Sequence, residues 1–174
     1  MEVAVIISET ESEPDSYPSA PGDLSDDALG VTTAVVWKRI EDWIRYRWAE
    51  RQVVWIVEGP GVFVPRLLPA TIDTREVWNG EAWETVTLDP APLGDKLDAK
   101  TYRITATVGS TDNPPPTVME AYTRLAEYTA HAEADPAQGH TRVSDGDYSF
   151  DRPATYAARA LHYSGAADLL RGYR

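Results

Sequence analysis

Residues 101–133 read TYRITATVGSTDNPPPTVMEAYTRLAEYTAHAE, and this stretch holds a strand pattern and a helix pattern in succession. Thr101 to Val108 alternates polar and apolar side chains, which predicts a half-buried strand. Gly109 to Pro116 ends that strand, because proline cannot donate to a ladder of backbone hydrogen bonds. Thr117 to Glu133 then repeats apolar residues at helical spacing. A strand followed directly by a helix predicts an α+β chain.

Two more strand-like runs lie upstream, around the dipeptide Asn79-Gly80. Thr71 to Trp78 precedes the dipeptide and Glu81 to Leu88 follows it. Asn-Gly between such runs predicts a β-hairpin, because both residues of the tight turn take positive φ. A two-residue turn pairs Arg75 with Glu84 and places Trp78 and Trp83 on one face.

The remaining strands are expected to be short. Val53 to Val57 is an apolar run that Gly59-Pro60-Gly61 interrupts. Val62 to Leu68 resumes the run with Pro65 inside it, which predicts an edge strand or an irregular one. Pro90 to Ala99 is expected to form a loop. Together with the hairpin and the strand at 101–108, these runs predict a small antiparallel β-meander.

Two further helical segments are expected at either side of this meander. The first runs from about Ser25 to Glu50, with Ser25 as a candidate N-cap and Gly30 weakening its start. The second runs from about Pro153 to Leu170. A polar loop, Asp135 to Asp147, is expected before it. The chain is thus predicted to be a small bundle of about three helices with an antiparallel β-meander or hairpin insertion.

Both ends of the chain are expected to extend from this core. The first 37 residues contain eight acidic side chains and no Lys or Arg, a composition typical of an extended or mobile arm, although 2–7 could pair as a covered strand. The predicted division is an acidic N-terminal arm at 1–24, a core at 25–133, and a loop with a C-terminal arm at 134–174.

The composition excludes several classes of protein. The chain has 174 residues, no Cys and a net charge of −12, so disulfide scaffolds and thiolate chemistry are excluded. Its longest apolar runs are far too short for a membrane span. An excess of 28 acidic over 16 basic side chains argues against a nucleic-acid-binding surface, which needs Lys and Arg to displace counterions.

No sequence pattern points to catalysis. His131, His140 and His162 are the only histidines, and they do not follow the spacing of a zinc site. Asp145-Gly146-Asp147 resembles the start of a calcium loop, but Tyr156 stands where an EF-hand needs a bidentate Glu. We therefore expect no enzyme activity, no metal and no cofactor. A hydrolase with a carboxylate pair stays a residual alternative that no spacing supports.

The six tryptophans are more than a small core needs. Trp43 and Trp48 fall on or near the apolar side of the first helical segment, whereas Trp78 and Trp83 fall on the hairpin. Aromatic side chains are enriched in protein–protein interfaces. Stacking on single-stranded nucleic acid is the competing use, and it lacks a basic groove.

Four segments, taken in order, resemble the head–tail connector (adaptor) proteins of long-tailed bacteriophages and gene transfer agents. The likeness covers roughly Asp26 to Arg174, and the arm at 1–24 has no counterpart in it. The segments are Asp26–Ile44 with its Trp37-Lys38-Arg39-Ile40-Glu41-Asp42-Trp43 run, the hairpin Trp78-Asn79-Gly80-Glu81-Ala82-Trp83, the strand Tyr102–Gly109 with the Pro-rich step and helix Val118–His131, and Ser144–Phe150 with the ending Leu169-Leu170-Arg171-Gly172-Tyr173-Arg174.

The resemblance implies a structural virion protein, made in the bacterial cytoplasm and located in the neck of the particle. Such adaptors form a ring, expected to have twelve copies, between the portal protein and a stopper or tail-terminator protein. Genomic DNA passes through the ring without sequence-specific binding. In the family, the C-terminal segment docks on the portal. Carried over to this chain, the docking residues are Tyr148, Phe150, Leu161, Leu169, Leu170, Tyr173 and Arg174.

A second reading comes from the charge alone. The acidic arm at 1–24 could make the protein a small regulatory or inhibitory module that binds a basic partner. That reading predicts a monomer whose binding depends strongly on salt and is lost when the arm is removed.

Overall fold

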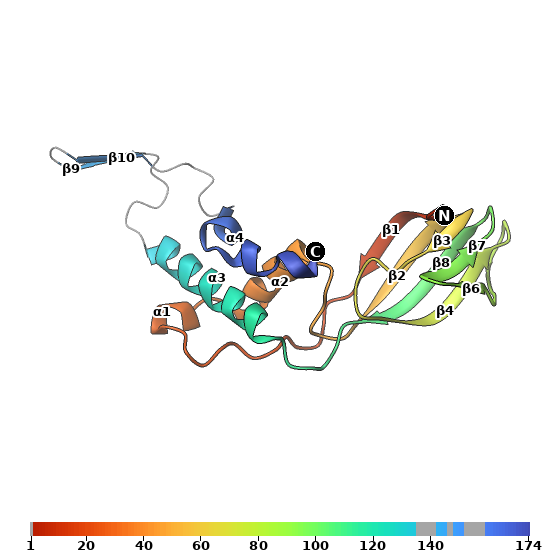
Figure 1. Cartoon of the computed structure of the whole chain (residues 1–174), viewed down its shortest axis with the longest axis horizontal. Helices are drawn as coiled ribbons and strands as arrows, with labels where there is room; N and C mark the ends of the chain where they lie inside the picture. The colour runs from red at the N-terminus through yellow and green to blue at the C-terminus, as the bar shows by residue number, and fades with distance from the viewer. Residues whose placement is uncertain (1, 135–141, 146–147, 152–158) are drawn as a thin grey trace. The chain divides into compact units, whose positions relative to one another are not determined.

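The computed structural model describes residues 2–134, 142–145, 148–151 and 159–174 (Figure 1). The chain forms two compact units, and each unit combines two separate segments. The first, called here the β unit, contains the segment up to Ser16 together with Arg45–Asp112. The second, the helical unit, contains Tyr17–Ile44 and the described residues from Asn113 onward. The chain is therefore of the α+β class, as predicted.

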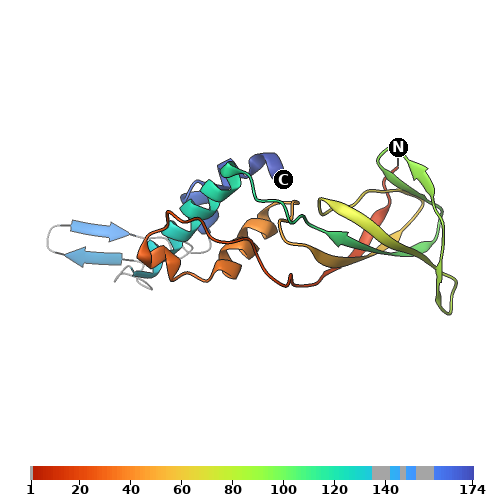
Figure 2. The ribbon, with the colours of Figure 1, turned by 90° about the horizontal axis from the view of Figure 1, so that it is seen from below.

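The larger sheet of the β unit has five antiparallel strands in the order β1-β2-β8-β4-β5 (Figures 1 and 2). The inner strands β2 and β8 pair along their full length, from Arg51↔Val108 to Glu58↔Thr101. The strands are β1 (Val5–Glu11), β2 (Arg51–Glu58), β4 (Ala70–Trp78), β5 (Trp83–Thr85) and β8 (Thr101–Val108).

A three-stranded sheet completes the β unit, in the order β3-β7-β6. A parallel bridge between Val3 and Val62 joins it to the chain just before β1. An ion pair also links the sheets, because the Arg75 guanidinium on β4 donates to the Asp95 carboxylate at 2.7 Å. The strands of this sheet are β3 (Gly61–Phe63), β6 (Asp89–Ala91) and β7 (Gly94–Leu97).

The predicted alternation of residues 101–108 is confirmed. Along β8 every second side chain is buried, and the same holds along β2. Trp55 is the largest side chain of this core and is fully buried beside Phe63, with ring centroids 5.5 Å apart. Its indole N–H donates to the Glu9 carboxylate of β1 at 2.7 Å, so the polar end of a buried tryptophan is satisfied. The strand residues buried with them are Val53, Val57, Leu97, Tyr102, Ile104, Ala106 and Val108.

The hairpin exists, but its predicted register is wrong. Trp78 pairs with Trp83, so the loop has four residues rather than two. The Asn79 side chain makes this loop possible, because its carbonyl oxygen accepts from the N–H groups of Glu81 and Ala82 at 2.8 Å each. The predicted loop at Pro90–Ala99 is also wrong, since it contains most of β6 and all of β7.

The helical unit is organised around α3 (Pro116–Ala134), which packs against all its other α-helices (Figure 2). Its buried side contains Val118, Ala121, Tyr122, Leu125 and Ala126. The other helices are α1 (Asp26–Leu29), α2 (Thr33–Trp43), α4 (Ala160–Tyr163), α5 (Ala166–Leu169) and the 3₁₀ turn η2 (Arg171–Tyr173).

An aromatic pair holds α2 on α3. The rings of Trp37 and Tyr122 lie 5.2 Å apart, and both side chains are almost fully buried. The Trp37 indole N–H donates to the backbone carbonyl of Pro18 at 2.9 Å. Pro18 lies in the segment that leads to α1, so this bond ties that segment to the same core. Burial raises the pKa of the Tyr122 hydroxyl.

The first predicted helix, Ser25–Glu50, is wrong in its extent. Gly30 separates α1 from α2, and α2 ends at Trp43. The residues after Ile44 belong to the β unit. There the Arg47 N–H donates to the Leu68 carbonyl at 2.7 Å instead of to a carbonyl of the preceding helix. Ser25 is the N-cap, as predicted, because its hydroxyl accepts from Ala28 N–H.

The predicted arms also differ from the observed organisation. Within 1–24, residues Val5–Glu11 form β1 as an ordinary strand of the large sheet. Within 134–174, β9 (Arg142–Asp145) occupies part of the predicted loop, and the last sixteen residues belong to the helical unit. The predicted helix from Pro153 begins outside the described residues, and its later part is α4, α5 and η2 rather than one helix.

Within the described ranges, no helix is both long and apolar enough to cross a membrane.

Gly61, at the junction of the two sheets, is expected to tolerate no side chain. It has a φ of +143°, and a Cβ there would lie 2.6 Å from the Ala4 backbone nitrogen. Gly61→Ala should therefore lower the unfolding free energy by about 2 kcal/mol or more. Gly80→Ala is the matched control, because Gly80 has a φ of +107° and a Cβ added there would meet nothing within 4 Å. Urea unfolding measures both, and equal losses would refute the close-approach argument.

Candidate functional site

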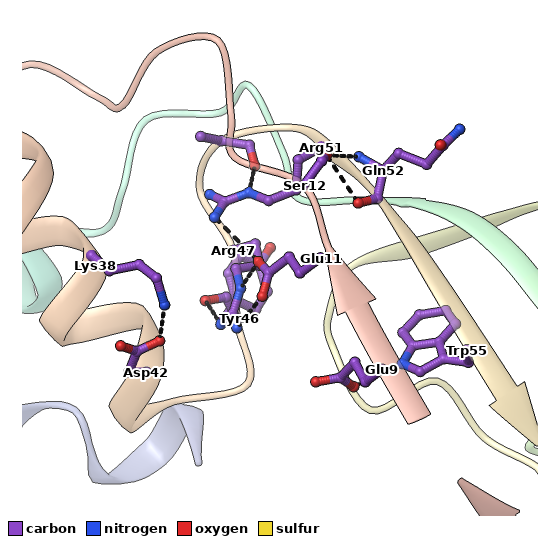
Figure 3. A network of polar contacts seen from close by, with 11 residues as sticks. Glu9, Glu11, Ser12, Lys38, Asp42, Tyr46, Arg47, Arg51, Gln52 and Trp55 are labelled. Atoms are coloured by element: carbon purple, nitrogen blue, oxygen red, sulfur yellow. Dashed lines mark hydrogen bonds and ion pairs between the residues drawn. The ribbon is translucent and has the colours of Figure 1, made fainter. Parts of the chain in front are cut away.

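A largely buried charged cluster lies at the end of β1, beside the start of the second segment of the β unit (Figure 3). The Glu11 carboxylate, at the end of β1, accepts from Arg47 Nε at 2.6 Å and from Arg47 Nη2 at 3.1 Å. The same carboxylate accepts from Arg51 Nη1 at 3.1 Å. Arg51 Nε also donates to the Ala49 carbonyl at 3.1 Å. One carboxylate thus bridges the end of β1 and the segment that begins β2.

The burial of this cluster decides its role. The side chains of Arg47 and Arg51 are only 6% and 2% exposed, and Glu11 is 21% exposed. Charges removed from water to this degree are stable only when paired and hydrogen-bonded. The cluster therefore holds the β unit together and is not a free recognition surface.

The C-terminal segment contains five of the seven predicted docking residues. Leu170 is fully buried in the helical unit, whereas Leu161, Leu169 and Tyr173 are partly exposed and Arg174 is exposed. Leu170 thus anchors the segment, and the other four side chains are the ones that a partner can reach. Gly165, with a φ of +77°, starts α5 and makes the turn that brings this segment back on α3.

The C-terminal residue, Arg174, packs on the ring of Trp43. The Arg174 guanidinium lies 4.2 Å from the centroid of the Trp43 ring, and the His162 imidazole meets the same ring edge-on at 4.9 Å. A guanidinium over an indole face gains about 0.5–1 kcal/mol at an exposed site. The sequence predicted Trp43 only as a core residue, so its contact with the C-terminal arginine was missed.

The other two predicted docking residues lie in a separate hairpin. Tyr148 and Phe150 are in β10 (Tyr148–Asp151), which pairs antiparallel with β9 from Tyr148↔Asp145 to Asp151↔Arg142. The backbone pairing is what the structure describes for these two residues. The structure therefore brings Leu161, Leu169, Leu170, Tyr173 and Arg174 together in one segment, with Tyr148 and Phe150 in another.

A second aromatic group lies on the outer face of the large sheet. Trp78 and Trp83 pack at 5.2 Å between centroids, and the Arg103 guanidinium lies 4.8 Å from the Trp83 ring. Arg103 also forms a bidentate pair with Glu76, at 2.6 and 2.7 Å. This hydrogen bonding lowers the pKa of Glu76 and raises that of Arg103. The prediction that Trp78 and Trp83 share a face is confirmed.

Glu127 of α3 fixes the start of α1. Its carboxylate accepts from the backbone N–H and from the hydroxyl of Ser25, both at 2.7 Å. These two bonds lower the pKa of the Glu127 carboxyl. Ser25 thereby acts as the cap of α1 and as its link to α3.

Comparison with known proteins gives no further assignment: no family model, no curated protein and no solved structure matches the chain. Among the described residues, no group of three or more His, Asp or Glu side chains is placed to hold a metal ion.

Replacing Glu11 by Gln should destabilise the β unit strongly. The change removes a carboxylate from two arginines that are almost fully buried, which costs about 3 kcal/mol or more. Glu13→Gln, at an exposed position two residues later, should change the stability by less than about 0.5 kcal/mol. Urea unfolding followed by tryptophan fluorescence measures both, and equal midpoints for the two variants would show that the cluster is not needed.

The contribution of Glu127 should depend on pH. Its pKa is lower in the folded chain than in the unfolded chain, so its stabilising effect is present at neutral pH and is lost as the pH falls through the lowered value. Glu127→Gln should therefore lower the melting temperature at pH 7, and the difference from the wild type should shrink below about pH 4. Glu120→Gln, on the exposed side of the same helix, is the control. A difference that stays constant with pH would contradict the argument.

Proposed function

We propose that this protein is a head–tail adaptor, a structural subunit of a ring below the portal in the neck of a tailed phage or gene transfer agent. The proposal starts from the four sequence segments that resemble this family. In the structure, these segments are α1 with α2, the tip of the β4–β5 hairpin, β8 with α3, and the β9–β10 hairpin with the last sixteen residues. The likeness therefore extends over both units.

The observation that carries the proposal is the C-terminal segment, which is anchored in the core by one side chain and exposes its neighbours. Leu170 anchors it in the core, while Leu169, Tyr173 and Arg174 lie partly or fully at the surface within five residues of one another. An anchored segment that presents an aliphatic, an aromatic and a cationic side chain is suited to dock on a partner protein. The portal is the partner that the resemblance implies. A stopper or tail protein would bind on the opposite side of the ring.

The charge of the chain agrees with a place around a DNA channel. A net charge of −12 repels the phosphate backbone, so DNA could pass without adhering. The proposed ring has twelve copies, in keeping with the resemblance.

The acidic regulatory module is the weaker proposal. Glu9 and Glu11 are two of the acids that would have to attract a basic partner, yet they bind Trp55 and the two buried arginines within the β unit. Their segment is a strand of the sheet. Removal of 1–24 would therefore unfold the β unit rather than simply remove a binding arm.

The test is binding to the portal protein encoded beside this chain. The double variant Tyr173→Ser with Arg174→Glu should lower the affinity for the portal at least about tenfold, because it removes an aromatic contact and reverses a charge at the segment's end. Arg66→Glu makes the same charge change at an exposed position in the β unit and should bind like the wild type. Leu170 is left unchanged, because its loss would disturb the core.

Electron microscopy of the mixture gives the second readout. The wild type should form a symmetric ring stacked on the portal. Absence of any complex at micromolar concentration and low salt would overturn the adaptor proposal. A normal complex with the double variant would overturn the assignment of the docking residues alone.

A further inference from the structure

The loop at the tip of the β4–β5 hairpin holds the side-chain amide of Asn79 at both ends. Its oxygen Oδ1 accepts from the backbone N–H groups of Glu81 and Ala82, at 2.8 Å each. Its nitrogen Nδ2 donates to the Glu84 carboxylate at 2.5 Å. These three bonds fix the orientation of an amide group that lies at the surface of the protein.

The next residue along the chain, Gly80, offers an unhindered nucleophile. Among the hydrogen bonds of the described residues, none is donated by the Gly80 N–H. Gly80 is exposed, and a Cβ built there would meet nothing within 4 Å. Glycine also lacks a side chain that would shield its own nitrogen. This nitrogen is therefore accessible to water and base, and it can close a cyclic imide with the Cγ atom of Asn79.

We propose that Asn79 is a site of self-catalysed deamidation, a covalent modification that needs only water. In the first step the Gly80 nitrogen gives its proton to water or hydroxide and forms a bond to Asn79 Cγ. The Cγ–Nδ2 bond then breaks, and Nδ2 takes up a proton from water and leaves as ammonia. In the second step water opens the cyclic imide. The product is an aspartate at position 79 or, where the main chain comes to run through Cγ, an isoaspartate.

The two bonds to Oδ1 make the loop a catalyst of the first step. Negative charge develops on Oδ1 when the Gly80 nitrogen adds to Cγ. The N–H groups of Glu81 and Ala82 already donate to this oxygen. Donors that are in place before the charge appears lower the barrier, as in the oxyanion holes of enzymes. The folded loop therefore accelerates the reaction relative to the unfolded chain, where these donors are bound to water.

Glu84 acts as a positioning residue. It lies on β5 and accepts from Nδ2, so the other end of the amide, Oδ1, stays on the N–H groups of the loop. Without this acceptor the amide is free to turn about its Cβ–Cγ bond, and Oδ1 leaves its donors for part of the time.

The sequence provides an internal control for the chemistry. The other asparagine of the chain, Asn113, is followed by Pro114. The proline nitrogen carries no proton to give up, so it cannot form the imide. Deamidation of asparagine by this route is therefore confined to Asn79.

The product changes the tip of the hairpin. A carboxylate at position 79 has no N–H to donate to Glu84 and meets it with a like charge. An isoaspartate also adds a carbon atom to the main chain of the loop, next to the paired residues Trp78 and Trp83. The modification should therefore loosen this tip and make it more acidic. The inference does not depend on the adaptor proposal, because it concerns only the chemistry of the loop.

The first experiment compares the rate of deamidation in the folded and the unfolded chain. The full chain is incubated at neutral pH in sodium chloride or in guanidinium chloride of equal concentration, and tryptic digests are followed by mass spectrometry. Cleavage after Arg75 and Lys96 releases one peptide in which Asn79 is the only side-chain amide. Its conversion replaces NH₂ by OH, which the mass reports.

The folded chain should react at least about fivefold faster than the unfolded chain. This ratio is well below the roughly 10²–10³ that one donor contributes in an enzyme, because the loop is exposed to water. Asn113 should stay unmodified in both solutions.

The second experiment tests the positioning role with variants. Glu84→Ala should bring the rate of the folded chain to within about twofold of the unfolded rate, whereas Glu84→Gln keeps an acceptor for Nδ2 and should restore most of the acceleration. Glu81→Gln is the matched control, because it removes a neighbouring exposed carboxylate and leaves the backbone N–H in place. It should react like the wild type. In guanidinium chloride all these chains should react at one rate.

The outcomes decide each part of the inference. Absence of conversion at Asn79 would overturn the site. A smaller ratio of folded to unfolded rates, or a slower reaction in the folded chain, would overturn the catalytic role of the loop. A folded Glu84→Ala variant that reacts like the wild type would overturn the positioning role. None of these results bears on portal binding, which tests the adaptor proposal separately.

Discussion

The β unit depends on one carboxylate. Glu11 ends β1, and the arginines that it binds lie in the segment that follows α2. Two guanidinium groups with side chains 6% and 2% exposed need such a partner, because burial without one would cost several kcal/mol. The same bonds fix where β1 stops and where the returning chain starts β2. The carboxylate thereby joins the edge strand β1 to the segment that leads into its neighbour β2.

The parts of the fold that the sequence predicted well are those in which one local pattern decides the outcome. β8 alternates over eight residues, and α3 repeats apolar residues over nineteen, so each element buries a defined face. The errors arise where a particular hydrogen bond, distant or local, overrides the pattern. The helical pattern continues past Trp43, yet Arg47 and Leu68 form backbone hydrogen bonds instead. The hairpin register depends on the Asn79 side chain, which caps a longer loop than the dipeptide rule assumes.

The candidate surfaces were predictable to different degrees. The hairpin tryptophans were placed on one face by simple counting along two strands. The contact of Arg174 with Trp43 joins residues far apart in sequence, and no local pattern reports it. The burial of Leu170 was missed for the same reason, since it depends on packing within the helical unit.

The division of each unit into two segments has a consequence for synthesis of the chain on the ribosome. All strands of the β unit lie within the first 112 residues, so this unit can close before the second half of the helical unit has been made. α2, with its buried face of Val36, Trp37 and Ile40, has to wait for α3 before that face is covered. The early helices therefore stay without their packing partners until α3 has been made, although they lie between the two segments of a β unit that can already have closed.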